Sequence, residues 1–169
     1  MKRSIVLGLV LLFSFCGKQN LSSKFQDDEF QNKFPMHPDE KMTPGELCKD
    51  TMVKRYPEQI PYCDRSVTSE VKQQIIVDYD RSFGFKIGTM QRVDLKIDHY
   101  IPLCMGGANS ALNLWPQHKS IYVQTDKIEE LLCKKMQSGK MLQTEAVQKI
   151  KRVKFHLDEA LELLSLLQK

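Results

Sequence analysis

An apolar run near the N-terminus is the feature that most restricts what this chain can be. Ile5 to Phe15 form an uncharged stretch of eleven residues, and Lys2 and Arg3 precede it. A helix needs about 20 apolar residues to span a membrane, so this stretch is too short to do so. A positive start followed by a short apolar core is typical of a secretory signal. We therefore expect the rest of the chain to fold outside the cytoplasm.

Cys16 follows the apolar run directly and precedes a polar segment. This arrangement resembles a bacterial lipoprotein signal, in which the cysteine is acylated and becomes the new N-terminus. The resemblance implies an exported bacterial protein, anchored to a membrane through lipid on Cys16 and facing the periplasm or the cell surface. A plain cleaved secretion signal is the alternative, because Phe15 stands where a small residue is usual.

Length and composition indicate one globular domain with a tail. Of the 169 residues, 41% are hydrophobic and 27% charged, which excludes a collagen-like, a fully disordered or a polytopic membrane protein. Segment 17–42 is polar without a sustained apolar period, and we predict a flexible tether there. The folded domain is expected at 43–140, with a helix packed on it at 141–169. The formal charge is +4 with Lys2 and Arg3, and is too small to indicate a nucleic-acid binder by itself.

Four cysteines remain after Cys16, an even number that suits disulfide bonding in an oxidising compartment. They are Cys48, Cys63, Cys104 and Cys133. None of them forms a C-x-x-C pair, which argues against a structural zinc site. Three pairings are possible. We favour Cys48 with Cys63 and Cys104 with Cys133, because each pair would close a loop between neighbouring elements.

Apolar periodicity predicts a small α+β domain. Helices are expected over about 68–81, about 120–136 and, as one long amphipathic helix, about 144–167. Apolar and polar residues alternate over 93–97, which predicts a half-buried strand. A short return strand is expected at 113–115, after a loop that contains proline and glycine. The order of helix, strand, loop, short strand, helix and helix is not that of a doubly wound sheet.

Asp98 and His99 stand together where the predicted strand ends. A carboxylate offers hard oxygen atoms to a metal ion, and a histidine that binds no metal can take a proton from water near neutral pH. The pair is therefore a candidate active site. A surface pair without a function is the alternative, and the dipeptide alone favours it.

A longer pattern surrounds this dipeptide. It consists of the run from Ile97 to Leu103, then Gly106-Gly107, then Asn109, and then the run from Asn113 to Gln117. This pattern resembles the HNH endonuclease family, in the branch with D-H-x-I-P-L, G-G and N-L-W-P-Q. The resemblance covers about residues 43–150. It implies a small ββα-metal core with flanking helices, and hydrolysis of phosphodiester bonds in nucleic acid, with DNA favoured over RNA.

The resemblance implies a role for each matching residue. His99 matches the histidine that activates the attacking water, and Asp98 matches the metal-binding acid before it. Asn113 matches the asparagine that ties the loop and holds the histidine in orientation. Gly106 and Gly107 match the glycines that let the chain fold back. The implied cofactor is one divalent metal ion, either Mg²⁺, Mn²⁺ or a transition metal such as Zn²⁺ or Ni²⁺, which would hold the scissile phosphate.

The chain departs from the family where many members carry a third His or Asn on the following helix, because Val123 stands there. His118 and Gln124 are the nearby alternatives. We favour His118 as the second metal ligand, because imidazole is the better ligand for a transition metal. The alternative interpretation of His118 is a solvent-facing histidine at the start of the helix.

Basic residues are frequent after the motif. They are Lys119, Lys127, Lys134, Lys135, Lys140, Lys149, Lys151, Arg152 and Lys154. They are interpreted either as solvated helix faces or as contacts to a phosphate backbone.

The leading hypothesis is a metal-dependent HNH-like endonuclease that acts on DNA with little sequence preference and is exported and lipid-anchored. A non-catalytic envelope lipoprotein that uses the HNH scaffold to bind nucleic acid or a protein is the alternative. A secreted toxin nuclease is a third and weaker one. The sequence indicates no oligomeric state.

Overall fold

The computed structural model describes residues 33–49 and 51–169. The predicted signal segment, Cys16 and residues 17–32 of the predicted tether lie outside these ranges. Within them, none of the helices is both long enough and apolar enough to cross a membrane.

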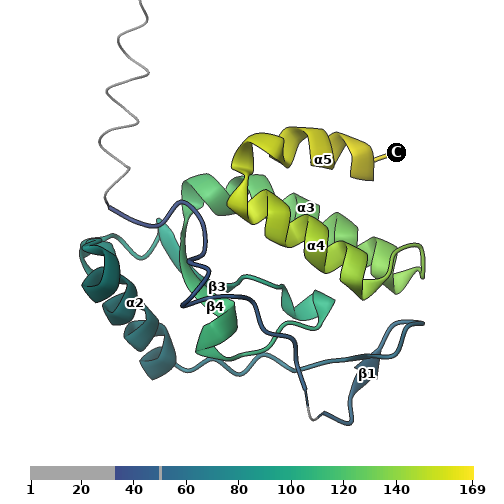
Figure 1. The fold of residues 1–169 in the computed structure, drawn as a ribbon, viewed down its shortest axis with the longest axis horizontal. Helices are drawn as coiled ribbons and strands as arrows, with labels where there is room; N and C mark the ends of the chain where they lie inside the picture. Colours follow the sequence, from purple (N-terminus) through teal and green to yellow (C-terminus); the bar gives the residue numbers. More distant parts are fainter. Residues whose placement is uncertain (1–32, 50) are drawn as a thin grey trace, which may run out of the picture.

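The described chain is a mixed α+β fold with four helices and two small antiparallel sheets (Figure 1). The helices are α2 (Ser69–Phe83), α3 (Lys119–Gln137), α4 (Gln143–Phe155) and α5 (Ala160–Leu167). The first sheet consists of β1 (Lys54–Arg55) and β2 (Ile60–Pro61), and the second of β3 (Leu95–His99) and β4 (Leu114–His118). The α+β class predicted from the sequence is confirmed.

The β3–β4 hairpin lies between α2 on one side and the group formed by α3, α4 and α5 on the other (Figure 1). Ile75 and Tyr79 of α2 are buried in one cluster with Ile97 of β3 and Trp115 of β4. A second buried cluster joins α3, α4 and α5. Its members include Ile128, Leu132, Ile150, Val153, Ala160 and Leu167. This second cluster also contains Ile101 and Met105 of the loop between the strands, so apolar contacts reach the β3–β4 segment from both sides.

Both strands of the hairpin differ slightly from their predicted bounds. β3 begins at Leu95, because Val93 is 74% exposed and lies before the paired register. β4 extends to His118 and includes Pro116, which stands opposite Ile97. A proline lacks the backbone N–H, but an edge strand tolerates it, and each strand of a two-stranded sheet has an edge without a partner.

The single C-terminal helix expected over 144–167 is not continuous. α4 ends at Phe155, a short 3₁₀ turn spans Leu157–Glu159, and α5 follows. The side chain of Arg152 donates two hydrogen bonds to the Glu159 carboxylate, at 2.5 and 2.7 Å, across this turn. The break turns the last helix back onto the domain, where Ala160 and Leu167 are buried.

The predicted tether does not reach the predicted domain boundary. Phe34 is 1% exposed and belongs to the cluster between α2 and the hairpin. Its ring stacks on that of His118 with 4.0 Å between the centroids. Residues 33–42 therefore belong to the folded domain, because a buried aromatic ring holds their first part in place.

Both favoured disulfides are present. Cys48 is bonded to Cys63 and Cys104 to Cys133, at sequence separations of 15 and 29 residues. The first ties the segment before β1 to the segment after β2, and the second ties the loop after β3 to α3. Two disulfides in one domain favour a compartment outside the reducing cytoplasm.

Candidate functional site

Asp98 and His99 form the C-terminal end of β3. Asp98 stands opposite Trp115, and His99 stands opposite Leu114, in the antiparallel register with β4. Successive side chains of a strand point to opposite faces of the sheet. The two residues of the predicted pair therefore have different surroundings, although they are neighbours in sequence.

Two carboxylates of α3 lie close to Asp98 and form an acidic cluster with it. Ligand atoms of Asp98, Asp126 and Glu129 all lie within 4.8 Å of one another. Lys96 pairs with Asp98 at 3.1 Å and with Asp126 at 2.8 Å. Burial alone would raise the pKa of Asp98, but the combined charges of Lys154 and Lys96 outweigh burial and lower this pKa below its usual value. Asp98 is therefore an ionised, partly neutralised carboxylate.

Lys154 of α4 is fully buried and links two other elements. Its Nζ lies 2.7 Å from Oε1 of Glu129 in α3 and donates a hydrogen bond of 2.7 Å to the backbone carbonyl of His99. Burial raises the pKa of Glu129, and the charge of Lys154 offsets part of this rise. The sequence interpretation of Lys154 as part of a solvated or phosphate-contacting face is wrong. Its spacing was the available signal, since it follows Ile150 by four residues on the apolar stripe of the helix.

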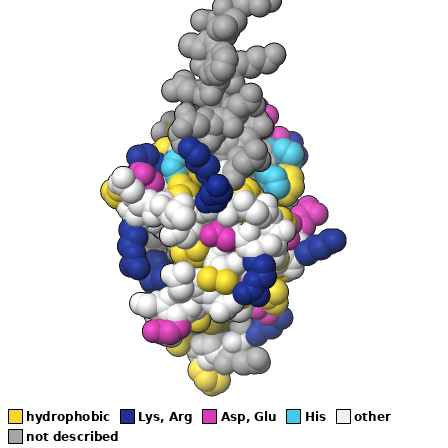
Figure 2. All heavy atoms as spheres, turned by 90° about the vertical axis from the view of Figure 1, so that its left-hand side faces the viewer, with side chains coloured by type: hydrophobic (Ala, Val, Ile, Leu, Met, Phe, Trp, Pro, Cys, Tyr) yellow, Lys and Arg dark blue, Asp and Glu magenta, His cyan; other side chains and the backbone are white. Residues whose placement is uncertain are grey.

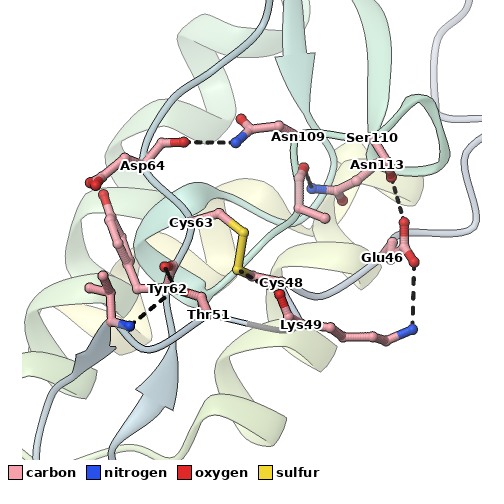
Figure 3. Close-up of a disulfide and its surroundings, with 12 residues drawn as sticks. Glu46, Cys48, Lys49, Thr51, Tyr62, Cys63, Asp64, Asn109, Ser110 and Asn113 are labelled. Atoms are coloured by element: carbon pink, nitrogen blue, oxygen red, sulfur yellow. Dashed lines mark hydrogen bonds and ion pairs between the residues drawn. A yellow bond between two sulfur atoms is a disulfide. The ribbon is translucent and has the colours of Figure 1, made fainter.

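His99 is a buried imidazole with one ring nitrogen engaged. Nε2 lies 3.1 Å from Oδ1 of Asn109, and Nδ2 of Asn109 donates to the carbonyl of Asp64 at 2.7 Å (Figure 3). The second contact fixes which amide atom faces the ring. Because Oδ1 can only accept, Nε2 carries the proton in this contact and Nδ1 is left as the basic atom. Burial lowers the pKa of His99, with smaller lowering by the charges of Arg65 and Lys154.

Asn113 ties the loop between β3 and β4. Its Oδ1 accepts from the backbone N–H of Ile101 at 2.8 Å, and its Nδ2 donates to the carbonyls of Ile101 and Ala108, both at 2.9 Å. The expected tie of the loop is therefore made entirely to backbone groups. The only link to His99 is indirect, through the strand end from which the loop departs.

The two loop glycines have different reasons to be glycine. A Cβ on Gly107 would lie 1.8 Å from the carbonyl oxygen of Ile101, so no other residue fits this close approach. Gly106 has a φ of +79°, a left-handed conformation that favours glycine. Both allow the chain to fold back toward β4.

His118 lies far along the hairpin from Asp98. It stands opposite Leu95, three residues before Asp98 in β3, and therefore points to the other face of the sheet. Nδ1 of His118 accepts the backbone N–H of Ser120 at 3.2 Å and caps α3. The structure does not bring His118 to Asp98. Gln124, the other alternative, is exposed and donates to the carbonyl of Ser120 in its own helix.

Oxygen donors for a metal ion are present beside Asp98, but His118, the imidazole predicted as the second ligand, does not lie there. Carboxylates are the ligands that Mg²⁺ and Mn²⁺ prefer, so Asp98 with Asp126 and Glu129 fits such an ion in donor chemistry. Acidic clusters also occur without any ion. Here the ammonium groups of Lys96 and Lys154 already pair with the carboxylates, so an ion would have to displace at least one of them.

The end of β3 thus offers a neutral imidazole with a basic nitrogen on one face. On the other face it offers a group of carboxylates with two ammonium groups, to which α3 and α4 contribute. Sequence reasoning missed Lys154 and the contact of Asn109 with the ring. Asn109 lies within the family-like pattern, and only its role was not predicted. Comparison of the chain with protein-family models, with curated proteins and with solved structures finds no match.

Proposed function

We propose that this chain is an HNH-like endonuclease that hydrolyses phosphodiester bonds in DNA with little sequence preference. The observation that carries the proposal is the His99 imidazole, whose Nε2 is held by Asn109 while no described residue hydrogen-bonds Nδ1. A lowered pKa keeps this imidazole neutral near pH 7, as a general base requires. The resemblance of the loop and the two strand segments to the HNH pattern supplies the reaction class.

His99 acts on water in the proposed reaction. Nδ1 takes a proton from a water molecule as the water oxygen forms a bond to phosphorus. The bond from phosphorus to the leaving oxygen breaks, and the leaving oxygen takes a proton from solvent. A divalent ion, held by Asp98 and a neighbouring carboxylate, would supply positive charge opposite the phosphate. The Asn109 amide keeps the ring in the tautomer that leaves Nδ1 basic.

A plasmid-nicking assay tests the proposal. The secreted domain should nick supercoiled DNA with Mg²⁺ or Mn²⁺, and a chelator should stop the reaction. His99→Ala should lose at least about 100-fold in rate, the usual contribution of a general base. His118→Ala serves as the matched control, because His118 is also a buried histidine of the hairpin but lies at its other end. Full activity of folded His99→Ala would reject the assignment.

The pH profile gives an independent check. Because burial lowers the pKa of His99 below the ordinary histidine value of 6.5, the imidazole loses its proton at a lower pH than a free histidine. The rate should therefore rise with pH below about 6.5 and be level at pH 7. An acid limb centred clearly above pH 6.5 would argue that another group is the base.

A non-catalytic scaffold is the second candidate function, and the two lysines favour it. Lys96 and Lys154 neutralise carboxylates that a metal ion would need. Isothermal titration of the chelator-treated domain with Mn²⁺ separates the two candidates. Binding that Asp98→Asn abolishes supports the nuclease, whereas DNA binding with neither Mn²⁺ binding nor nicking supports the scaffold.

We also propose that the protein is exported and anchored through lipid on Cys16. The disulfides support export, and the Cys16 proposal depends on the sequence pattern alone. Cys16→Ser should move the protein from the membrane fraction to a soluble fraction, or leave it unprocessed. Unchanged membrane association with normal processing would favour a plain secretion signal.

A further inference from the structure

A groove of about 430 Å³ runs between α2, the 3₁₀ turn Ile87–Thr89 and β3. Its lining includes the basic residues Arg65, Lys72, Arg92 and Lys96, and it contains no Asp or Glu. Figure 2 looks onto the α2 side of the molecule, where Lys and Arg side chains lie on both flanks of the face with a few Asp and Glu side chains between them. The groove is therefore a concave surface of one charge sign.

Three of these cations have no acidic partner among residues 33–49 and 51–169. Arg65, Lys72 and Arg92 form no ion pair with any residue in the part of the chain that the structure describes. The basic helices after the motif differ in this respect. Lys127 and Lys134 pair with Glu130, for example.

Basic residues of α4 also form ion pairs with nearby acidic residues. Lys149 pairs with Glu145, and Arg152 with Glu159. Local acids thus neutralise much of the surface on which the sequence predicts phosphate contacts. A phosphate binds an unpaired cation more strongly than a cation that must first separate from a carboxylate. The groove is therefore a better binding surface for a polyanion than these helices.

The groove borders β3, and the candidate site lies at the C-terminal end of that strand. Lys96 lines the groove and pairs with Asp98 at 3.1 Å. Arg65 directly follows Asp64, whose backbone carbonyl accepts a hydrogen bond from the Asn109 amide that contacts His99. The groove lining includes Leu95 and Ile97 of β3, the strand that ends at His99. A chain that leaves the groove along β3 is therefore directed toward the strand end that carries His99.

We propose that this groove binds the sugar–phosphate backbone of a DNA strand and directs its scissile bond to His99. The inference rests on the proposed nuclease function and adds the place where the substrate lies. Arg65, Lys72 and Arg92 contact phosphates, and the apolar side chains of Ile76 and Ile97 offer a floor for the sugars. Contacts of this kind carry no base information, which agrees with little sequence preference.

The test is binding of a fluorescent single-stranded 20-mer DNA by anisotropy, with His99→Ala as the background so that no cleavage occurs. Arg65→Gln, Lys72→Gln and Arg92→Gln are combined in one groove variant. Neutralising three contacts should weaken binding at least about 10-fold at low salt and reduce the slope of log K against log salt by about 2.

A second triple variant controls for net charge. Lys54→Gln, Lys135→Gln and Lys140→Gln remove the same charge from outside the groove, at residues that form no ion pair within the described chain. This variant should keep both the affinity and most of the salt slope. Equal losses in the two variants, or unchanged binding by the groove variant, would overturn the proposal. So would the absence of DNA binding by the parent protein.

Hydrolysis is measured separately, in the protein with His99 intact. The groove variant should lose DNA nicking but keep hydrolysis of bis(p-nitrophenyl) phosphate, which is too small to need the groove. Groove-dependent DNA binding by a protein that hydrolyses neither substrate would reject the nuclease while supporting the groove as a DNA-binding surface. Hydrolysis of DNA that does not depend on the three cations would support the nuclease and reject the groove.

Discussion

Replacement of Lys154 by methionine is the sharpest test of how the site is held together. The lysine ammonium has 0% exposure and lies 2.7 Å from both Glu129 Oε1 and the His99 carbonyl oxygen. Methionine has a similar length and an apolar end, so it can fill the space without either polar contact. The variant leaves Glu129, which is only 17% exposed, without its cation.

The cost follows from the burial of the pair. Removal of one partner of a buried ion pair destabilises a protein by about 3–5 kcal/mol, because the other charge stays buried and unpaired. Lys154→Met should therefore lower the free energy of unfolding by about that amount at pH 7. Replacement of both partners by apolar residues is often neutral or stabilising, so Lys154→Met with Glu129→Leu should recover most of the loss.

The loss of stability caused by Lys154→Met should also depend on pH. Burial raises the pKa of Glu129, and Lys154 opposes that rise, so the variant raises the folded-state pKa further above the ordinary glutamate value of 4.5. A carboxyl group with a raised folded pKa contributes stability that is present below the unfolded pKa and is lost as pH rises. Asp98 adds to the trend, because it loses one of the charges that lower its pKa. The cost of Lys154→Met should therefore be small near pH 4.5 and grow toward pH 8.

Urea unfolding at pH 4.5, 6, 7 and 8 measures the free energy of unfolding of four proteins. They are the parent, Lys154→Met, Glu129→Leu and the double variant. An Arg at position 154 keeps the charge and serves as a further control for the loss of the cation. A cost below about 1 kcal/mol at pH 7, or one that does not change with pH, would refute the reasoning.

Three further outcomes are expected. Cys104→Ala with Cys133→Ala should lower the free energy of unfolding by roughly 3.5 kcal/mol, from the entropy of a 29-residue loop, as measured in urea. Asn113→Ala should cost about 2–4 kcal/mol in the same assay, because it leaves buried backbone groups of the loop unpaired. His118→Ala should cost about 1 kcal/mol through the lost cap of α3, and should leave the metal concentration at half-maximal nicking unchanged. A rise of 10-fold or more in that concentration would instead support His118 as a ligand.

Local patterns in the sequence were sufficient for α2, the β3–β4 hairpin, α3 and the cross-links, but not for the short strands β1 and β2. The alternation around Leu95 and Ile97 marks a strand with one buried face, and that face is the one packed against α2. The Cys48–Cys63 pairing follows from short loop closure, which depends on sequence separation and not on long-range packing. The break at His156 could not be predicted in the same way. The residues around it are compatible with a helix, and the chain turns there because α5 gains buried surface on α3.

The ligand partner of Asp98 could not be assigned because register and face were unknown. His118 is close to the motif in sequence, and imidazole chemistry favours it as a ligand. In an antiparallel hairpin, however, proximity depends on which residues stand opposite each other. The pairing of Leu95 with His118 places that imidazole at the far end of the strand from Asp98 and on the other face. The residues that reach Asp98 come instead from the middle of α3, where Asp126 and Glu129 are three residues apart and share one helix face.

The sequence also could not show which basic residues after the motif are available to contact a phosphate, for a related physical reason. A count of lysines and arginines along a helix does not distinguish a cation that faces solvent from one that is paired or buried. Glu130 lies three residues after Lys127 and four before Lys134, spacings at which helix side chains meet, so it neutralises both. Arg65 and Arg92 are far apart in sequence, and neither belongs to a run of basic residues. They become one surface only because α2 packs beside β3 and brings the segments before and after that helix to the same groove.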